Sequence, residues 1–278
     1  MVYRFFLSMT CILFAINTAG DIRKIHSFGQ ASEVLASVDH GTLVLFDVDA
    51  TITVPGSPML WANVIKIHGQ WLEQLYDEVF KKSARSKEYL QSIWQDQEIP
   101  KLVESDIVHI IANLQERQVP VFALTAIMTG SYYSIPSLPE WRYAKLKQVT
   151  IDFKHEDFSD HIFTNLPMYD EQYPLFYKGI LFSTVVSKGD VLGAFLDRIE
   201  WEPTLVIFFD DNLMRVQEVE SEMNKRKIPF IGYHYHGIEC LTDKLNKEIA
   251  AFQLNYLVQY ERWIMEDEAY MLLKTECI

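Results

Sequence analysis

The chain has 278 residues, of which 49% are hydrophobic and 23% are charged, so it carries enough apolar surface to fold and is not a disordered protein. Its 38 acidic and 25 basic side chains give a net charge of −13, which argues against general binding to nucleic acid or to an anionic membrane surface. The length predicts one core domain that carries an insertion.

The first 20 residues have the pattern of a secretory signal peptide. Arg4 precedes an apolar run from Phe5 to Ile16, and cleavage is expected after Ala19 or Gly20. The run is shorter than the roughly 20 apolar residues of a membrane span, and an uncleaved N-terminal anchor is the alternative. We therefore expect export to the periplasm or the medium, without stable membrane insertion after cleavage.

Export changes the interpretation of the cysteines. Removal of the signal peptide leaves Cys240 and Cys277, which could form a disulfide in an oxidising compartment or remain as two thiols. Their spacing fits neither a zinc site nor a redox pair.

The hydrophobic pattern after the signal peptide predicts strands that alternate with helices. A short apolar run at 41–46 predicts a buried strand, and apolar residues at helical spacing follow over 59–80 and 102–114. A second buried strand is expected at 119–124. The turn-rich stretch that follows, 126–175, is expected to be irregular.

The second half of the chain continues the alternation. Strands are predicted at 178–182, 205–209 and 228–233, and helices at 188–199 and 213–226. Ser187, with Asp190 three positions later, is expected to cap the first of these helices. The C-terminal segment is expected to be helical, with four buried apolar residues, Leu254, Leu257, Trp263 and Ile264. This pattern predicts an α/β fold with a doubly wound, parallel sheet.

Polar residues follow three of the predicted strands, and a lysine begins a predicted helix. These residues are Asp47, Asp49, Thr125, Lys188, Asp210 and Asp211. In a doubly wound sheet the carboxyl ends of the strands face one crevice, where several carboxylates stay ionised only beside a cation. An all-oxygen set of ligands suits Mg²⁺, which often binds carboxylates together with a substrate phosphate. The sequence therefore predicts a site for Mg²⁺ and a phosphate group together.

These motifs resemble those of the haloacid dehalogenase-like (HAD) superfamily. Residues 47–51, DVDAT, are similar to its D-x-D-x-T signature, and Thr125, Lys188 and residues 210–211 resemble its second, third and fourth motifs in the right order. The resemblance covers roughly residues 40–260 and looks closest to a bacterial branch that carries a signal peptide. It implies a Rossmann-like core with a mostly helical cap inserted between the first two motifs.

The resemblance also implies a role for each residue. Asp47 would be the nucleophile that forms an aspartyl-phosphate, and Asp49 would act as general acid and then as general base. Asp47, the main-chain carbonyl of Asp49 and Asp210 would hold Mg²⁺. Thr125 and Lys188 would hold the phosphoryl oxygens and neutralise their charge.

Two further residues of these motifs have secondary expectations. Asp211 would tune Lys188 or a bound water molecule. Ala50 stands where many relatives have glycine, and alanine tolerates a positive φ less well. If the turn after the first strand needs a positive φ, it would cost on the order of 1 kcal/mol at this residue.

The resemblance implies a phosphatase that acts on a small phosphate ester or on a phosphorylated side chain such as phosphotyrosine. Its partner would then be a small phosphomonoester or a phosphoprotein, and not nucleic acid. One alternative is a HAD-like binding or effector protein that keeps the metal and phosphate pocket but has weak or no chemistry. Another is a phosphotransferase that passes the phosphoryl group to an acceptor other than water. The sequence leaves the substrate and the oligomeric state open.

The walls of the crevice are expected from two insertions. Residues 52–118 would form the cap, with a hinge at Pro55-Gly56, and residues 126–176 would form a second, irregular wall. His234 and His236 share one face of a strand and could bind metal or lie at the surface. Four aromatic residues could pack in the interior or line the substrate site: Tyr132, Tyr133, Trp141 and Tyr143.

Overall fold

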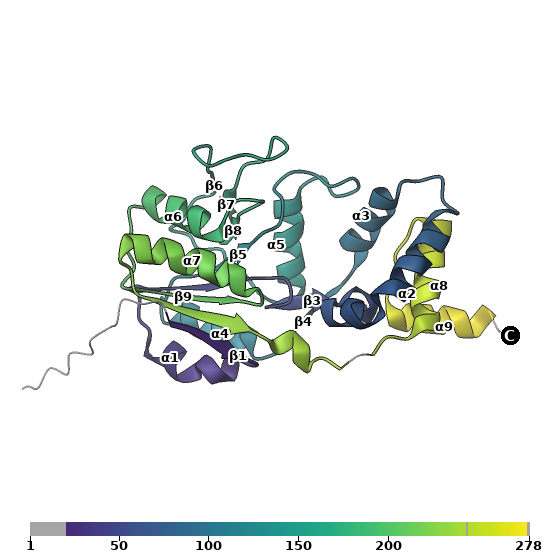
Figure 1. The fold of residues 1–278 in the computed structure, drawn as a ribbon, viewed down its shortest axis with the longest axis horizontal. Coiled ribbons are helices and arrows are strands. Elements are labelled where there is room, and N and C mark those ends of the chain that lie inside the picture. Colours follow the sequence, from purple (N-terminus) through teal and green to yellow (C-terminus); the bar gives the residue numbers. More distant parts are fainter. Residues whose placement is uncertain (1–20, 243, 277–278) are drawn as a thin grey trace, which may run out of the picture.

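The computed structural model describes residues 21–242 and 244–276 (Figure 1). The predicted signal peptide and Cys277 lie outside these residues, so the structure bears on neither the cleavage site nor the disulfide. A mixed α/β core occupies one side of the molecule, and a helical subdomain lies beside it (Figure 1).

The core is built on a sheet of eight strands within the described residues. In spatial order they are β1 (Asp21–Ile25), β10 (Phe230–Tyr235), β9 (Leu205–Asp210), β2 (Thr42–Phe46), β5 (Val121–Thr125), β8 (Ile180–Phe182), β7 (Leu175–Tyr177) and β6 (His161–Ile162). The first six are parallel, and β7 and β6 continue the sheet antiparallel. The prediction of an α/β fold with a mostly parallel sheet is confirmed.

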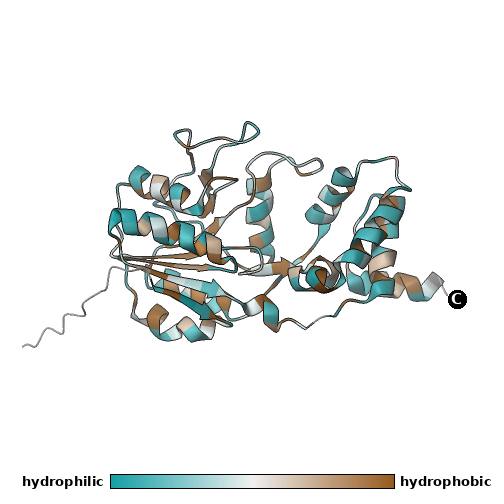
Figure 2. Cartoon of the chain, viewed as in Figure 1, coloured by the Kyte–Doolittle hydropathy of each residue, from teal (hydrophilic) through white to brown (hydrophobic). Residues whose placement is uncertain are grey.

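Helices cover both faces of this sheet, which explains why its central strands are mostly apolar (Figure 2). Helices α1 (Ser32–Ser37), α4 (Ile107–Glu116) and α5 (Leu138–Gln148) contribute to the apolar core on one face. Helices α6 (Lys188–Arg198) and α7 (Leu213–Arg226) cover the other face. Inside the first of these cores, the ring of Phe209 stacks between those of Phe46 and Tyr233, at centroid distances of 4.8 and 4.5 Å.

The helical subdomain combines two distant parts of the chain. Its apolar core joins α2 (Ala62–Phe80) and α3 (Lys87–Gln97) to α8 (Lys247–Tyr260), and α9 (Glu266–Glu276) packs on α8. A two-stranded antiparallel ribbon of β3 (Thr53–Pro55) and β4 (Pro100–Leu102) leads from the core to α2 and back from α3. Of the segment expected as a cap, residues 52–118, the helices α2 and α3 lie in this subdomain, whereas α4 lies against the sheet.

Several elements differ from the sequence prediction. The stretch at 126–175 contains α5, and residues 100–102 form β4 instead of the first turn of a helix. Lys178 and Gly179 have φ of 49° and 79° and form the turn between β7 and β8, so that β8 begins only at Ile180. Trp263 and Ile264 are buried as predicted, but they lie between α8 and α9.

Three short 3₁₀ helices complete the described chain: Phe28–Ala31, Pro58–Leu60 and Gly237–Cys240. Among the described residues, no helix has the length and apolar character needed to cross a membrane.

Candidate active site

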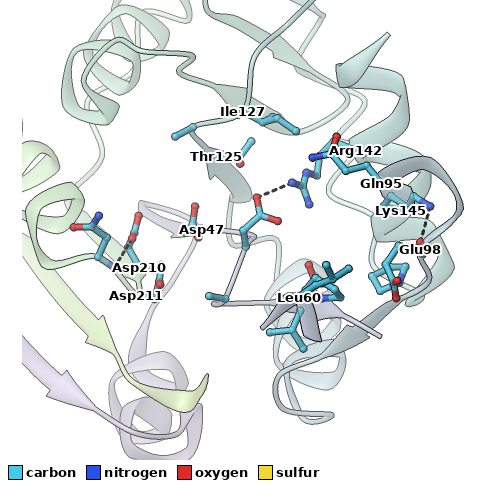
Figure 3. A pocket seen from close by; sticks show the side chains of 18 of the residues that line it. Asp47, Leu60, Gln95, Glu98, Thr125, Ile127, Arg142, Lys145, Asp210 and Asp211 are labelled. Atoms are coloured by element: carbon cyan, nitrogen blue, oxygen red, sulfur yellow. Dashed lines mark hydrogen bonds and ion pairs between the residues drawn. The ribbon is translucent and has the colours of Figure 1, made fainter. Parts of the chain in front are cut away.

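The six residues singled out in the sequence line one cavity of about 820 Å³ at the carboxyl ends of the central strands (Figure 3). They are Asp47 and Asp49 after β2, Thr125 at the end of β5, Lys188 at the start of α6, and Asp210 and Asp211 at the end of β9. Since β2 lies between β5 and β9 in the sheet, the topology itself brings these residues together.

Lys188 lies at the centre of this group and bridges two carboxylates. Its Nζ donates to Asp47 Oδ1 at 2.5 Å and to Asp210 Oδ2 at 2.6 Å. All three residues are buried, with 1%, 6% and 1% of Lys188, Asp47 and Asp210 exposed. A buried ammonium between two carboxylates is held in place, because each group would be costly to bury without the other.

The start of α6 fixes the position of Lys188. The Ser187 hydroxyl accepts hydrogen bonds from the amides of Gly189 and Asp190, so the helix begins at Lys188 as predicted. Gly189 allows α7 to approach closely, since a Cβ atom there would lie 2.2 Å from the carbonyl oxygen of Glu218. The glycine therefore allows the start of α6, which carries Lys188, to pack against α7.

Burial and mutual repulsion raise the pKa values of the carboxyl groups in this site. Burial and the neighbouring Asp210 together raise the pKa of Asp47 to about 7, against the opposing attraction of Lys188. Burial likewise raises the pKa of Asp210, and it raises the pKa of Asp211 to about 6. Burial alone would lower the pKa of Lys188, but the two carboxylates hold it above its ordinary value. The three carboxylates around Lys188 are therefore not fully compensated by its single positive charge.

Three of the carboxylates could share a cation. Oxygen atoms of Asp47, Asp210 and Asp211 lie within 4.8 Å of one another, and they form the only such group of three His, Cys, Asp or Glu side chains among the described residues. Three carboxylates face one ammonium, so a divalent cation would balance the charge, and the all-oxygen donors suit Mg²⁺. Asp211 thus contributes a carboxylate to the group, beyond the supporting role expected from the sequence.

Asp49 lies apart from these three carboxylates. Its side chain is 64% exposed and accepts a hydrogen bond at 2.6 Å from Arg142, whose side chain is only 6% exposed. The turn beyond it is closed by hydrogen bonds from the amide of Ala50 to the carbonyl of Thr53 and from the amide of Thr53 to that of Val48. Ala50 has φ of 62°, so this turn does require the left-handed conformation that glycine adopts without cost.

Several residues of the cavity were not predicted from the sequence, among them Glu98, Arg142 and Lys145. Glu98 precedes the ribbon strand β4, whereas Arg142 and Lys145 come from α5. Apolar residues do not recur on one face of α5, so its sequence carries no helical period. The local signal was its start, where Ser137 caps the amide of Glu140 and Pro139 occupies the first turn.

The other side chains considered from the sequence have separate surroundings. His234 is hydrogen-bonded through Nε2 to the carbonyl of Asp211 at 3.1 Å, and through Nδ1 to His236 at 3.1 Å. Among the described residues, the two imidazoles are not part of a group of three metal-ligating side chains. Of the four aromatic residues, Trp141 lines the cavity, whereas Tyr143 donates a hydrogen bond to Asp152 outside it. The rings of Tyr132 and Tyr133 contact each other edge to face.

Known proteins are similar to this chain, some over nearly its whole length and some over about half of it. A family model described as "Protein of unknown function (DUF2608)" matches residues 24–270. An uncharacterized protein of Rickettsia prowazekii is 26% identical over 96% of this chain and 96% of its own length. A second uncharacterized protein of that organism is 32% identical over 55% of this chain and 53% of its own length. A Chlamydia muridarum protein named "Putative outer membrane protein" is 27% identical over 91% of this chain and 88% of its own length.

Proposed function

The chain belongs to the DUF2608 family, and we propose that it is a Mg²⁺-dependent phosphatase of the HAD type that acts through Asp47. The observation that supports this most is the meeting of Asp47, Lys188, Asp210 and Asp211 at the carboxyl ends of neighbouring parallel strands. Carboxylates for a metal, an ammonium for an anion and a buried nucleophile are what phosphoryl transfer requires.

In this proposal Asp47, Asp210 and Asp211 would hold Mg²⁺, which neutralises charge on the phosphoryl group when it is bound. The carboxylate of Asp47 attacks phosphorus, and the bond from phosphorus to the ester oxygen breaks. Asp49 gives its proton to the leaving oxygen, so the alcohol departs neutral. Lys188 and the Thr125 hydroxyl bind the phosphoryl oxygens.

The second half of the reaction frees Asp47. Asp49, now ionised, takes a proton from water while the water oxygen attacks phosphorus. The bond from phosphorus to the Asp47 oxygen breaks, and inorganic phosphate and the original carboxylate result. The exposure of Asp49 in the cavity supports this role, because its carboxyl group can reach both a leaving group and a water molecule.

The test uses residues 21–278, para-nitrophenyl phosphate, and either Mg²⁺ or a chelator. We expect hydrolysis that needs the metal and is lost in Asp47→Asn. Asp49→Asn should slow turnover by roughly 100- to 10,000-fold, the usual contribution of a general base, because nitrophenolate leaves without a proton and the loss falls on the attack of water. Asp106→Asn, outside the cavity, is the matched control and should keep full activity. Turnover that survives Asp47→Asn would overturn the proposal, whereas metal or phosphate-ester binding without turnover would favour the binding-protein alternative.

We also propose that the protein acts outside the cytoplasm. The signal-peptide pattern of the first 20 residues supports export, as does the similarity to the Chlamydia muridarum protein named "Putative outer membrane protein". Fractionation of cells that produce the full chain, with detection of a shortened form in the periplasm or medium, tests this. Recovery of only full-length protein in the membrane fraction would favour an uncleaved anchor.

A further inference from the structure

Helix α5 carries two buried cations on the cavity wall away from Asp210 and Asp211 (Figure 3). Arg142 and Lys145 are three positions apart, so they share one face of the helix. Only 5% of Arg142 and 7% of Lys145 is exposed, and both line the cavity. Two buried cations at one place are costly unless anions compensate them.

The protein itself compensates them incompletely. Arg142 pairs with the exposed carboxylate of Asp49, and its buried Nε has no hydrogen-bond partner within the described chain. Lys145 donates to the backbone carbonyls of Asp96 and Glu98, at 2.5 and 2.8 Å, and forms no ion pair with any described carboxylate. An ammonium has three donors, so one donor of Lys145 remains. The buried Nε1 of Trp141, beside them on α5, also has no partner in the described residues.

Glu98 accepts from Lys145 only through its backbone carbonyl, because its carboxylate is bound elsewhere. The carboxylate of Glu98 accepts hydrogen bonds from the amide and the hydroxyl of Ser57, both at 2.9 Å, and from Trp263 Nε1 at 2.6 Å. These contacts hold Glu98 against the helical subdomain, so only its backbone carbonyl meets Lys145. Within the described residues, Lys145 therefore lines the cavity without an ion-paired carboxylate, and Arg142 has only the exposed carboxylate of Asp49.

We propose that Arg142 and Lys145 form a second anion subsite, and that the substrate is a small phosphomonoester with a second anionic group, either a carboxylate or a phosphate. This inference rests on the proposed function, in which the first phosphate binds beside Asp47 and Lys188. A cavity of about 820 Å³ has the size of pockets that hold small molecules, so both ends of such a substrate fit inside it. The second anion would supply the acceptors that the α5 donors lack.

Pairs of substrates that differ only in the second group test the subsite. Glycerol 3-phosphate is compared with 3-phosphoglycerate, which adds a carboxylate, and fructose 6-phosphate with fructose 1,6-bisphosphate, which adds a phosphate. In one pair we expect kcat/KM to be at least tenfold higher for the compound with two anionic groups. The pair that shows this difference identifies the second group as a carboxylate or a phosphate. In Lys145→Met this preference should fall at least tenfold. Lys147→Met, on the same helix but outside the cavity, should keep it.

The outcomes separate this inference from the proposed function. Equal kcat/KM for both members of both pairs refutes the subsite and leaves the phosphatase standing, as does a preference that Lys145→Met retains. If no substrate is hydrolysed, the phosphatase fails, and calorimetric binding of the same four compounds decides on the subsite. Tighter binding of a compound with two anionic groups, weakened in Lys145→Met, supports the subsite. Equal binding of both members of each pair refutes the subsite. Lys145→Gln, which can still donate to the two carbonyls, replaces Lys145→Met if that variant does not fold.

Discussion

Replacement of Lys188 by methionine is the most direct test of the electrostatics of the site. Methionine keeps the length and apolar stem of the side chain but removes the ammonium that lies 2.5 Å from Asp47 and 2.6 Å from Asp210. Because these carboxylates are 6% and 1% exposed, water cannot replace the lost partner. Removal of one member of a buried ion pair costs about 3–5 kcal/mol, and we expect Lys188→Met to lower the free energy of unfolding by this amount near pH 8.

The pH dependence gives this prediction a second readout. In Lys188→Met the two carboxylates lose the charge that favours their ionised form, so their pKa values in the folded state rise further above the unfolded values. Their ionisation then opposes folding at high pH, and protonation removes this penalty as the pH falls through the raised pKa. The cost of Lys188→Met should therefore be larger at pH 8 than at pH 5.

Urea denaturation followed by tryptophan fluorescence, in buffer with chelator, measures the loss in the free energy of unfolding and its dependence on pH. Lys147→Met is the matched control, since Lys147 forms an exposed ion pair with Asp152 on the surface, and no measurable change is expected there. A loss in Lys188→Met no larger than that of the control would refute the reasoning. A loss that is independent of pH would show that packing, and not uncompensated charge, is responsible.

Three further predictions concern the same site. Burial raises the pKa of Asp47 from 3.8 to about 7, so its proton binds the folded state more tightly, and the metal-free protein should lose stability as the pH rises through this interval; a thermal midpoint that increases across it would contradict this. Gly189→Ala would place Cβ 2.2 Å from the Glu218 carbonyl and should cost about 1–3 kcal/mol in urea denaturation. In Gly69→Ala the new Cβ meets nothing within 4 Å, so the free energy of unfolding should instead rise by about 0.5–1 kcal/mol. If both variants changed stability in the same direction, the packing argument would be wrong. Ala50→Gly relieves a φ of 62° and should leave stability unchanged or raise it by up to about 1 kcal/mol, whereas a clear loss would show that the turn is unstrained.

The core of the fold could be predicted because its information is local. Strands that are buried on both faces consist almost entirely of apolar residues, and each one ends at polar residues that line the cavity. The beginning of α6 was equally local, since Ser187 and Lys188 lie next to each other in the sequence. The strand ends therefore gave the positions of Asp47, Thr125 and Asp210 together.

The α5 side of the cavity depends on contacts that leave no local pattern. Arg142 and Asp49 are 93 residues apart in the sequence, and no local sequence pattern at either residue predicts that they form an ion pair. The same holds for the packing of α8 on α2 and α3, since an amphipathic helix shows that it buries a face but not against which partner. A charged residue in a segment without a hydrophobic period is expected at the surface, so the sequence does not predict that Lys145 is buried in the cavity wall.

The helical subdomain is joined to the sheet by three stretches of chain: β3, β4 and the chain between β10 and α8. The third is attached to the base of α2, where the side-chain amide of Asn63 donates to the carbonyl of Leu241. A lobe on a single tether can swing in any direction, whereas three connections leave fewer directions of movement. Any opening of the cavity would thus be a restricted movement, and the wall that carries Glu98 would return to nearly the same place each time.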